Sequence, residues 1–249
     1  MTTLASIILG SAVILLFMRF ARRGRTWTLR RVPGLDAIEE AVGRCTELKR
    51  PLHYNAGLAN VRGATAAETM AAINVLSYVS ALCAKHDTQM IVTCCNYEQL
   101  PYLEEAVQTA FAAAGKTVPD DYVRYVGAGQ GQLSIAAQGI FEREKIAANI
   151  MMGGYDEEAV SIAEKGYRVG AMGIGGTARM GQVAILAAVM DYTLIGEELY
   201  AAGAYVSGDP VQVASVAGAD LPKIAGMLLI LIGLVLQNFG LPYVKWLNM

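Results

Sequence analysis

A chain of 249 residues with 54% hydrophobic and only 17% charged residues is too apolar for a purely soluble domain, in which about 25% are charged. Its 20 basic and 22 acidic residues give a net charge of −2, which excludes the broad basic surface of a nucleic-acid-binding protein. We therefore expect part of the chain to lie in lipid or in protein interfaces.

The first hydrophobic segment, residues 4–18, carries no charge and precedes a group of arginines. These are Arg19, Arg22, Arg23, Arg25, Arg30 and Arg31. A secretory signal carries its charges before the apolar run, so this order favours a membrane anchor over a cleaved signal peptide. The segment is shorter than the ~20 residues that span a bilayer, but flanking residues and long arginine side chains extend its reach. The positive-inside tendency places the N-terminus outside and the following domain in the cytoplasm.

Apolar residues at helical spacing predict a helix over residues 35–48, and strand and helix patterns then alternate. The predicted strands cover residues 51–56, 89–95, 123–126, 147–152, 168–174 and 192–195. The predicted helices cover residues 66–85, 98–114, 133–143, 157–165, 178–190 and 197–206, with a glycine-rich turn at 175–177. This alternation predicts an α/β fold, a Rossmann-like parallel sheet with helices on both faces.

A break at residues 207–210 and a short predicted helix at 211–216 precede a second uncharged segment, residues 224–236. It becomes long enough to span a bilayer at Leu241 if the polar pair at 237 and 238 enters the interface. A buried core helix is the competing interpretation. The residues that flank the segment as interfacial anchors would are Lys223, Tyr243, Lys245 and Trp246.

These patterns predict three regions: a transmembrane anchor over residues 1–22, a cytoplasmic α/β domain over 23–220 and a second transmembrane anchor over 221–249. With two spans, both termini lie outside a cell membrane. Small residues in the anchors permit close helix packing in lipid. They are Ala5, Ser6, Gly10, Ser11, Ala12, Ala225, Gly226 and Gly233.

The chain offers no recognisable catalytic or metal-binding arrangement. The P-loop pattern and the G-x-S-x-G elbow are both absent, and Ser134 has no visible base. His53 and His86 lack partners at metal-ligand spacing. The four cysteines, Cys45, Cys83, Cys94 and Cys95, show no framework spacing and are expected to be reduced and buried, with the last two on opposite faces if they lie on a strand. We predict no catalytic residue, metal or cofactor.

Glycine and polar residues follow the predicted strands, where open parallel sheets bind ligands. Glycines let a backbone approach a ligand, but tight strand-to-helix turns need them as well. The candidate ligand-binding residues are Asn55, Asn96, Gly127, Gly129, Gln130, Gly153, Gly154, Gly175, Gly176, Thr177, Arg179, Glu197 and Glu198.

Two of these groups have more specific interpretations. Residues 127–132, G-A-G-Q-G-Q, resemble a dinucleotide-binding pattern, but Gln132 stands where the pattern needs glycine or alanine. A nucleotide would instead bind residues 173–177, with Arg179 supplying charge. Glu197 and Glu198 diverge by roughly 100° on a helix, which argues against a shared acid/base role, and a helix start explains both through the dipole.

Residues 191–202, D-Y-T-L-I-G-E-E-L-Y-A-A, resemble a family of bacterial and archaeal membrane-anchored proteins classed as a domain of unknown function. The resemblance extends to residues 30–44, 143–149 and 175–178 and covers nearly the whole length. It implies membrane placement and α/β architecture and transfers no activity. Where this chain has Arg179, an acid is expected in such proteins, which argues against a shared phosphate role.

We therefore expect a non-enzymatic, membrane-anchored protein that self-assembles into an oligomeric scaffold at the cytoplasmic face. Its expected partners are the lipid bilayer and further copies of itself. The alternatives are a module or enzyme that binds a nucleotide or another phosphorylated ligand at the glycine-rich edge, and an accessory subunit of a larger membrane complex.

Overall fold

The computed structural model describes the backbone of residues 2–28 and 32–238, and the side chains of residues 7–28 and 32–235. The chain divides into two compact units, residues 31–207 and residues 1–30 together with 208–249. The roles predicted for Arg30, Arg31, Ala5 and Ser6, and for the segment from 237 onward with its aromatic anchors, concern side chains outside the described ones.

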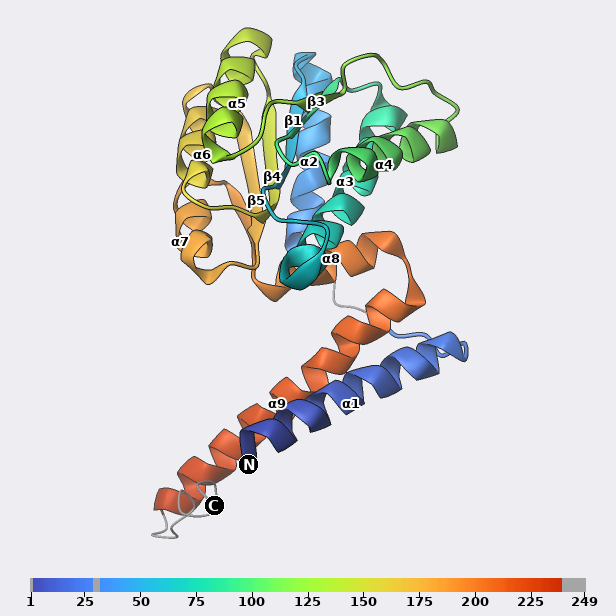
Figure 1. Cartoon of the computed structure of the whole chain (residues 1–249), viewed down its shortest axis with the longest axis vertical. Coiled ribbons are helices and arrows are strands. Elements are labelled where there is room, and N and C mark those ends of the chain that lie inside the picture. Colours follow the sequence, from blue (N-terminus) through green and yellow to red (C-terminus); the bar gives the residue numbers. More distant parts are fainter. Residues whose placement is uncertain (1, 29–31, 239–249) are drawn as a thin grey trace. The chain divides into compact units, whose positions relative to one another are not determined.

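Residues 31–207 form a parallel sheet, six-stranded in the described residues, with the order β3-β2-β1-β4-β5-β6 (Figure 1). The strands are β1 (Leu52–Gly57), β2 (Met90–Cys94), β3 (Val123–Tyr125), β4 (Ala148–Gly154), β5 (Met172–Thr177) and β6 (Tyr192–Ile195). The connecting elements are α2 (Pro33–Leu48), the short η1 (Gly63–Thr65), α3 (Ala66–His86), α4 (Leu100–Ala113), α5 (Gln130–Glu144), α6 (Glu158–Arg168), α7 (Met180–Val189) and α8 (Glu197–Ser207). The predicted parallel α/β fold is confirmed.

Helices cover both faces of the sheet because successive strand side chains point to opposite sides. One hydrophobic cluster joins the sheet to α2, α3, α4 and α8, and a second joins it to α5, α6 and α7. Cys94 lies in the first cluster and Cys95 in the second, as their adjacent positions predicted. The strands at the centre are therefore buried on both sides, which explains their continuous apolar character.

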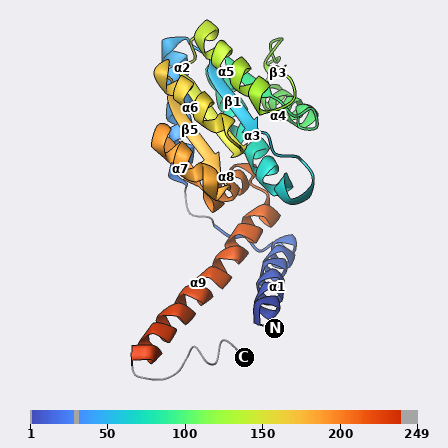
Figure 2. The same ribbon diagram turned by 60° about the vertical axis from the view of Figure 1, so that its left-hand side comes forward.

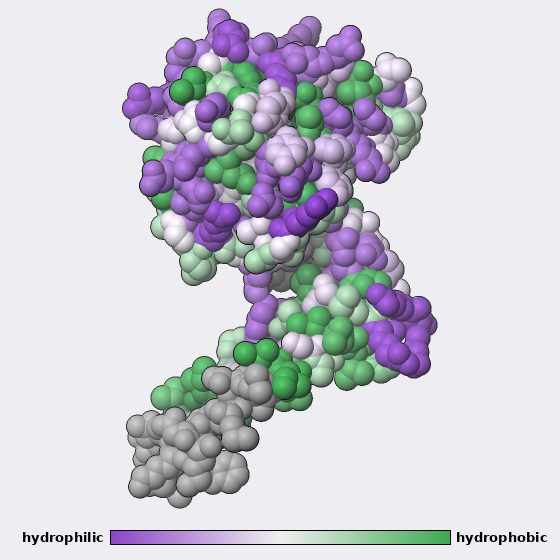
Figure 3. Space-filling model, viewed as in Figure 1, coloured by the Kyte–Doolittle hydropathy of each residue, from purple (hydrophilic) through white to green (hydrophobic). Residues whose placement is uncertain are grey.

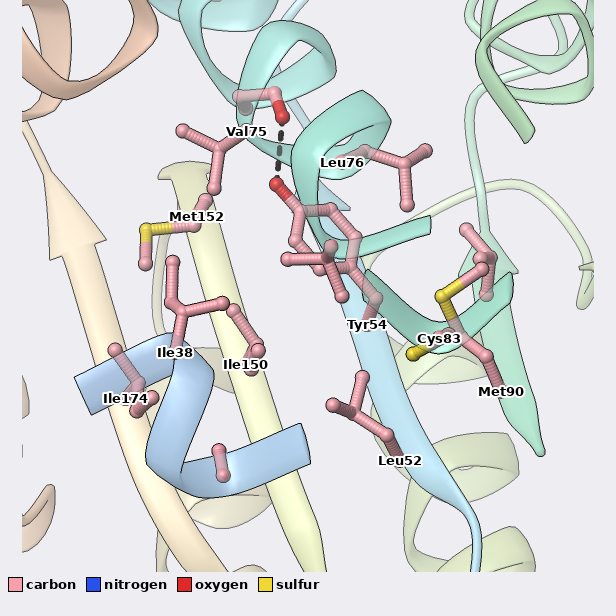
Figure 4. Packing of buried hydrophobic residues seen from close by; sticks show 14 of the residues in the cluster. Ile38, Leu52, Tyr54, Val75, Leu76, Cys83, Met90, Ile150, Met152 and Ile174 are labelled. Atoms are coloured by element: carbon pink, nitrogen blue, oxygen red, sulfur yellow. Dashed lines mark hydrogen bonds between the residues drawn. The ribbon is translucent and has the colours of Figure 1, made fainter. Parts of the chain in front are cut away.

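Figure 4 shows the first cluster, in which Ile38 of α2 lies over Ile150 and Ile174 of the sheet. Tyr54 is fully buried there, and its hydroxyl donates a 2.6 Å hydrogen bond to the carbonyl of Ala72 in α3. Burial raises the pKa of Tyr54 well above its ordinary value, so the phenol stays protonated. This bond ties α3 to the central strand at the amino-terminal half of the helix.

Two predicted boundaries are wrong. Arg168 ends α6 and does not begin a strand, and β5 runs through Gly175, Gly176 and Thr177, which the sequence pattern assigns to a turn. These glycines sit in the strand because neighbouring side chains crowd both faces. A Cβ on Gly175 would lie 3.3 Å from Leu186 of α7, and one on Gly176 would lie 2.5 Å from the Met152 sulfur.

The other unit contains α1 (Thr2–Arg22) and α9 (Pro210–Asn238), which lie side by side and run in opposite directions (Figures 1 and 2). The short helix predicted at 211–216 and the second hydrophobic segment form one helix, which continues through Pro222. The two helices meet at Gly218, where a Cβ would lie 3.0 Å from Phe17 and 3.2 Å from Ile14. Gly10 and Gly226 belong to the small residues predicted to permit close packing in lipid, and within this chain a Cβ on either would have no atom within 4 Å.

Among the described residues, two helical stretches are long and apolar enough to cross a bilayer, Gly63–His86 and Pro210–Val235. The most apolar window of the first is 56% buried, as in a core helix, whereas that of the second is only 11% buried. In α1, Ile7, Leu9 and Leu15 are at least 64% exposed. Figure 3 shows hydrophobic residues over much of the described surface of α1 and α9, and hydrophilic residues over much of the sheet unit. This distribution weakly favours membrane association.

Candidate functional site

The sheet order reverses direction between β1 and β4, and this switch point is where sheets of this order bind ligands. Five of the predicted site residues gather around it. They are Asn55, Gly153, Gly154, Thr177 and Arg179. Of the remaining predicted residues, Gly175 and Gly176 lie inside β5, and the others lie elsewhere along the carboxyl-terminal ends of the strands.

The ends of β1 and β4 are closed against each other by backbone contact. Gly57 pairs with Gly154, and the Leu58 N–H donates a 2.8 Å hydrogen bond to the Gly154 carbonyl. A Cβ on Gly153, whose φ is +119°, would lie 2.4 Å from the Ala56 carbonyl oxygen. The glycines at this point therefore serve strand-to-strand contact, which a larger residue would prevent.

A chain of buried polar side chains crosses the sheet beneath this closure. His53 contacts Asn149 Oδ1 at 2.8 Å and Thr93 Oγ1 at 2.9 Å, and Asn55 Nδ2 donates to the same hydroxyl at 3.0 Å. The Tyr155 hydroxyl donates to the Asn55 carbonyl at 2.8 Å. Both ends of the Asn55 amide are therefore used inside the protein, since Oδ1 accepts from Gly57 N–H at 2.8 Å.

Burial lowers the pKa of His53 to about 4, while the hydrogen bond to Asn149 acts in the opposite direction. The ring is therefore neutral at pH 7. Because an amide oxygen only accepts, Nδ1 of the neutral ring donates to Asn149 and Nε2 accepts from the Thr93 hydroxyl. His53 is a structural histidine of the sheet, and its ring forms a T-shaped pair with the Phe141 ring, with the ring centroids 4.8 Å apart.

Arg179 contacts the loop after β4 and the first turn of α3 at the switch point. Its Nη1 donates to the Tyr155 carbonyl at 3.0 Å and to Asp156 Oδ1 at 2.5 Å, and its Nε lies 3.9 Å from Glu68 Oε2. Glu68, from the first turn of α3, is 4% exposed and accepts from Ala178 N–H at 2.9 Å. The sequence prediction missed Glu68, Tyr155 and Asp156. An acidic residue in the first turn after β1 was the available signal for Glu68.

Buried oxygen atoms without a hydrogen-bond partner occur in the first turns or caps that follow three strands. In the part of the chain with described side chains, these atoms are Gln99 Oε1, Glu158 Oε2 and Gln182 Oε1. Burial raises the pKa of Glu158, against two backbone hydrogen bonds that lower it. All three oxygens are acceptors when Glu158 is ionised, and Glu68 and Asp156 add negative charge. The carboxyl-terminal ends of these strands therefore suit a ligand that donates hydrogen bonds better than a phosphate.

The other predicted residues have contacts within the chain. Asn96 Nδ2 donates to Asn60 Oδ1 at 2.8 Å. Gly127 and Gly129 adopt positive φ beside Gln132, and Gln130 begins α5, beyond the β3 end of the sheet. At the opposite end, Glu198 Oε2 accepts from Ile195 N–H at 3.0 Å, while Glu197 is the first residue of α8. Glu198 thus covers a backbone donor at the end of the edge strand β6.

The described residues contain no group of three or more His, Cys, Asp or Glu that could hold a metal ion. All four cysteines are buried and unbridged, and burial raises the pKa of Cys45 and Cys95 to about 12, so both remain thiols at pH 7. Two cavities of about 240 Å³ lie at the amino edge of the sheet. Residues 118–123 contribute to one, and residues 87–89 to the other.

A comparison with curated proteins finds no match to this chain. The family resemblance in the sequence is confirmed: a family model described as a domain of unknown function (DUF6754) matches residues 1–247, and the chain belongs to that family.

Proposed function

We propose that this protein is a non-enzymatic scaffold, anchored in a cell membrane by α1 and α9, that self-associates through surfaces including its anchors. The observation that carries the proposal is the outward apolar surface of the helix pair. In α9, Ile230 and Leu234 are 65% and 60% exposed, and α1 exposes Ile7 and Leu9 as strongly. Exposing such an apolar surface to water is unfavourable, whereas burying it in lipid or against a neighbouring copy is favourable.

The positions of the arginines support the proposed orientation. Arg19, Arg22, Arg23 and Arg25 follow the apolar part of α1, and basic residues favour the cytoplasmic side. The sheet unit is then cytoplasmic and both termini lie outside. Reporter fusions test this: alkaline phosphatase joined after Met249 is active under this topology, and an inactive fusion contradicts it.

The switch point supports a structural role for the sheet unit. Tyr155, Arg179 and Glu68 form hydrogen bonds within this chain around the ends of β1 and β4. A scaffold needs this edge to be stable and does not need it to open.

An alkaline wash of membranes followed by sizing tests the proposal. We expect the full chain to remain in the membrane pellet and, after detergent extraction, to have a protein mass of at least two chains by light scattering. A chain released by the wash, or a monomer in detergent, contradicts the proposal.

The second candidate function is ligand binding at the switch point, and the sheet order favours it. The acidic groups there indicate a donor-bearing ligand. Thermal-shift measurements with nucleotides and with amine or polyol compounds separate the two functions, because a ligand at 100 times its dissociation constant stabilises by about 2.7 kcal/mol. A shift with amines but not nucleotides supports this candidate, and silence across both sets supports the scaffold.

A further inference from the structure

The α9 helix carries an ion pair at a depth where its neighbour α1 has no charged residue. Lys223 Nζ lies 3.1 Å from Asp220 Oδ1, one turn away. Both residues flank Pro222, which sits inside the helix and removes the donor that would bond the Gly218 carbonyl. Ionised side chains next to a break in backbone hydrogen bonding are rare in spanning helices and mark functional positions.

The contact at Gly218 fixes the depth of this ion pair. Gly218 lies against Ile14 and Phe17, and the helices run in opposite directions, so the level of Arg19 on α1 corresponds to about Ser215 on α9. Asp220 and Lys223 then lie about 8–12 Å further along the helix, beside the uncharged part of α1. A path of about 20 residues from that level ends near Val235, which is the length a bilayer needs.

The ion pair faces away from α1. At 100° per residue, Asp220 and Lys223 lie about 200° and about 140° around the helix from Gly218, the residue in contact with α1. Their side chains are 55% and 41% exposed. In the bilayer proposed for this helix, both charges therefore face lipid unless another helix covers them.

A second copy of the same helix is complementary to this surface. Under a two-fold axis along the membrane normal, two parallel copies bring Asp220 of each within reach of Lys223 of the other, because the two residues differ in height by one turn or less. Asp220 and Lys223 of each copy then gain an oppositely charged partner on the other copy, in addition to each other. The four charges lie between the two helices and no longer face lipid. Met227 lies about 180° from Gly218 and continues the same face.

We propose that the Asp220, Lys223 and Met227 face of α9 is a homodimer interface, held by ion pairs exchanged between two copies inside the membrane. This inference rests on the proposed anchoring and self-association and names the surface responsible. In a single chain, Asp220 and Lys223 pair with each other. Both charges are therefore paired in the separate chain as well as in the dimer.

A charge exchange tests the interface with the full chain in its membrane. The double variant Asp220→Lys/Lys223→Asp keeps an ion pair within each helix and remains compatible with itself. In a mixed dimer, Asp220 of the wild type faces the aspartate at position 223 of the variant, and Lys223 faces the lysine at position 220, so like charges meet. We expect differently tagged copies to be captured together in the two like combinations and the mixed combination to be reduced by roughly tenfold.

Cysteine cross-linking in membranes supplies a readout that is independent of charge. Met227→Cys is expected to form a cross-linked species of twice the chain mass on oxidation. Leu229→Cys is the matched control, because the two side chains are 58% and 54% exposed but Leu229 lies about 180° from Asp220. The wild type, whose cysteines are buried, reports the background.

The outcomes separate the interface from the proposed function. Equal capture in the mixed combination, or equal cross-linking at 227 and 229, overturns this interface while self-association stands. A cross-link at 227 to a different polypeptide overturns the choice of a second copy. Failure of wild-type copies to capture each other overturns the self-association on which the inference rests.

Discussion

The Tyr155 hydroxyl donates a 2.8 Å hydrogen bond to the backbone carbonyl of Asn55, and so joins the ends of the two strands between which the sheet order reverses. The phenol is fully buried, and burial raises its pKa well above the ordinary value. It also lies 3.0 Å from Asn55 Oδ1. A position that often admits a ligand is occupied by a side chain of this chain.

Replacing that phenol measures its contribution. Tyr155→Phe leaves two buried oxygens of Asn55 with one donor fewer, so we expect the free energy of unfolding to fall by about 1–2 kcal/mol. Denaturant unfolding of the detergent-extracted chain provides the measurement. Tyr167→Phe, at a residue 69% exposed, is the control and is expected to change stability by less than about 0.5 kcal/mol. Equal effects would remove the structural role assigned to Tyr155.

His53 predicts a pH dependence of stability. Its folded pKa of about 4 is below the ordinary 6.5, so between these values the unfolded chain binds a proton that the folded chain excludes. Stability therefore falls as the pH drops from about 6.5 to about 4, by up to about 3 kcal/mol from this residue. Unfolding curves across this range should show a smaller slope for His53→Gln than for the wild type. A His53→Gln variant that keeps the full wild-type slope would contradict the assignment.

Two glycine-to-alanine substitutions should change the free energy of unfolding in opposite directions. Gly153→Ala places a Cβ 2.4 Å from the Ala56 carbonyl oxygen in a positive-φ conformation, so we expect a loss of about 3 kcal/mol or more in unfolding free energy. Gly181→Ala in α7 meets no atom within 4 Å and should stabilise by about 0.5–1 kcal/mol. Thermal unfolding of both variants provides the measurement. A tolerated alanine at 153 would show that the strand ends separate easily.

Arg179 and Glu68 should be energetically coupled. Arg179→Gln removes the cation 3.9 Å from a carboxylate that is almost fully buried, and we expect a loss of about 1–2 kcal/mol. Adding Glu68→Gln should recover part of that loss, with a coupling of about 1 kcal/mol in a double-mutant cycle. Arg168→Gln is the control, since its pair with Glu164 is exposed and within one helix turn. Simple additivity of Arg179 and Glu68 would show that their charges act independently.

The periodicity of the chain was sufficient to predict the α/β class, the alternation and most element positions. The sheet order was not predicted, because Leu52 and Ala148 pair across 96 residues and no local pattern encodes that pairing. The prediction of a turn at Gly175 and Gly176 was wrong for a related reason. Glycine is permissive in turns and equally permissive where Leu186 and Met152 press on a strand, and only the tertiary packing distinguishes these uses.

The candidate site was predicted in part. Selecting residues after each strand found Asn55 and Gly154, because parallel strands end on one side of the sheet, and Arg179 came from the nucleotide interpretation of residues 173–177. It did not find Tyr155 or Glu68, which are indistinguishable in sequence from an ordinary aromatic residue and an ordinary first-turn acid. Their roles depend on burial and on the direction of the side chain, which follow from the packed structure. Whether the edge binds a ligand stays a prediction.

The mass of single particles extracted directly from native membranes in polymer-bounded lipid discs tests the central claim most directly. The account predicts discs that contain two or more copies of the full chain, held through anchors that remain in lipid. A population of discs with one copy each, or a chain recovered without lipid in the soluble fraction, would contradict it.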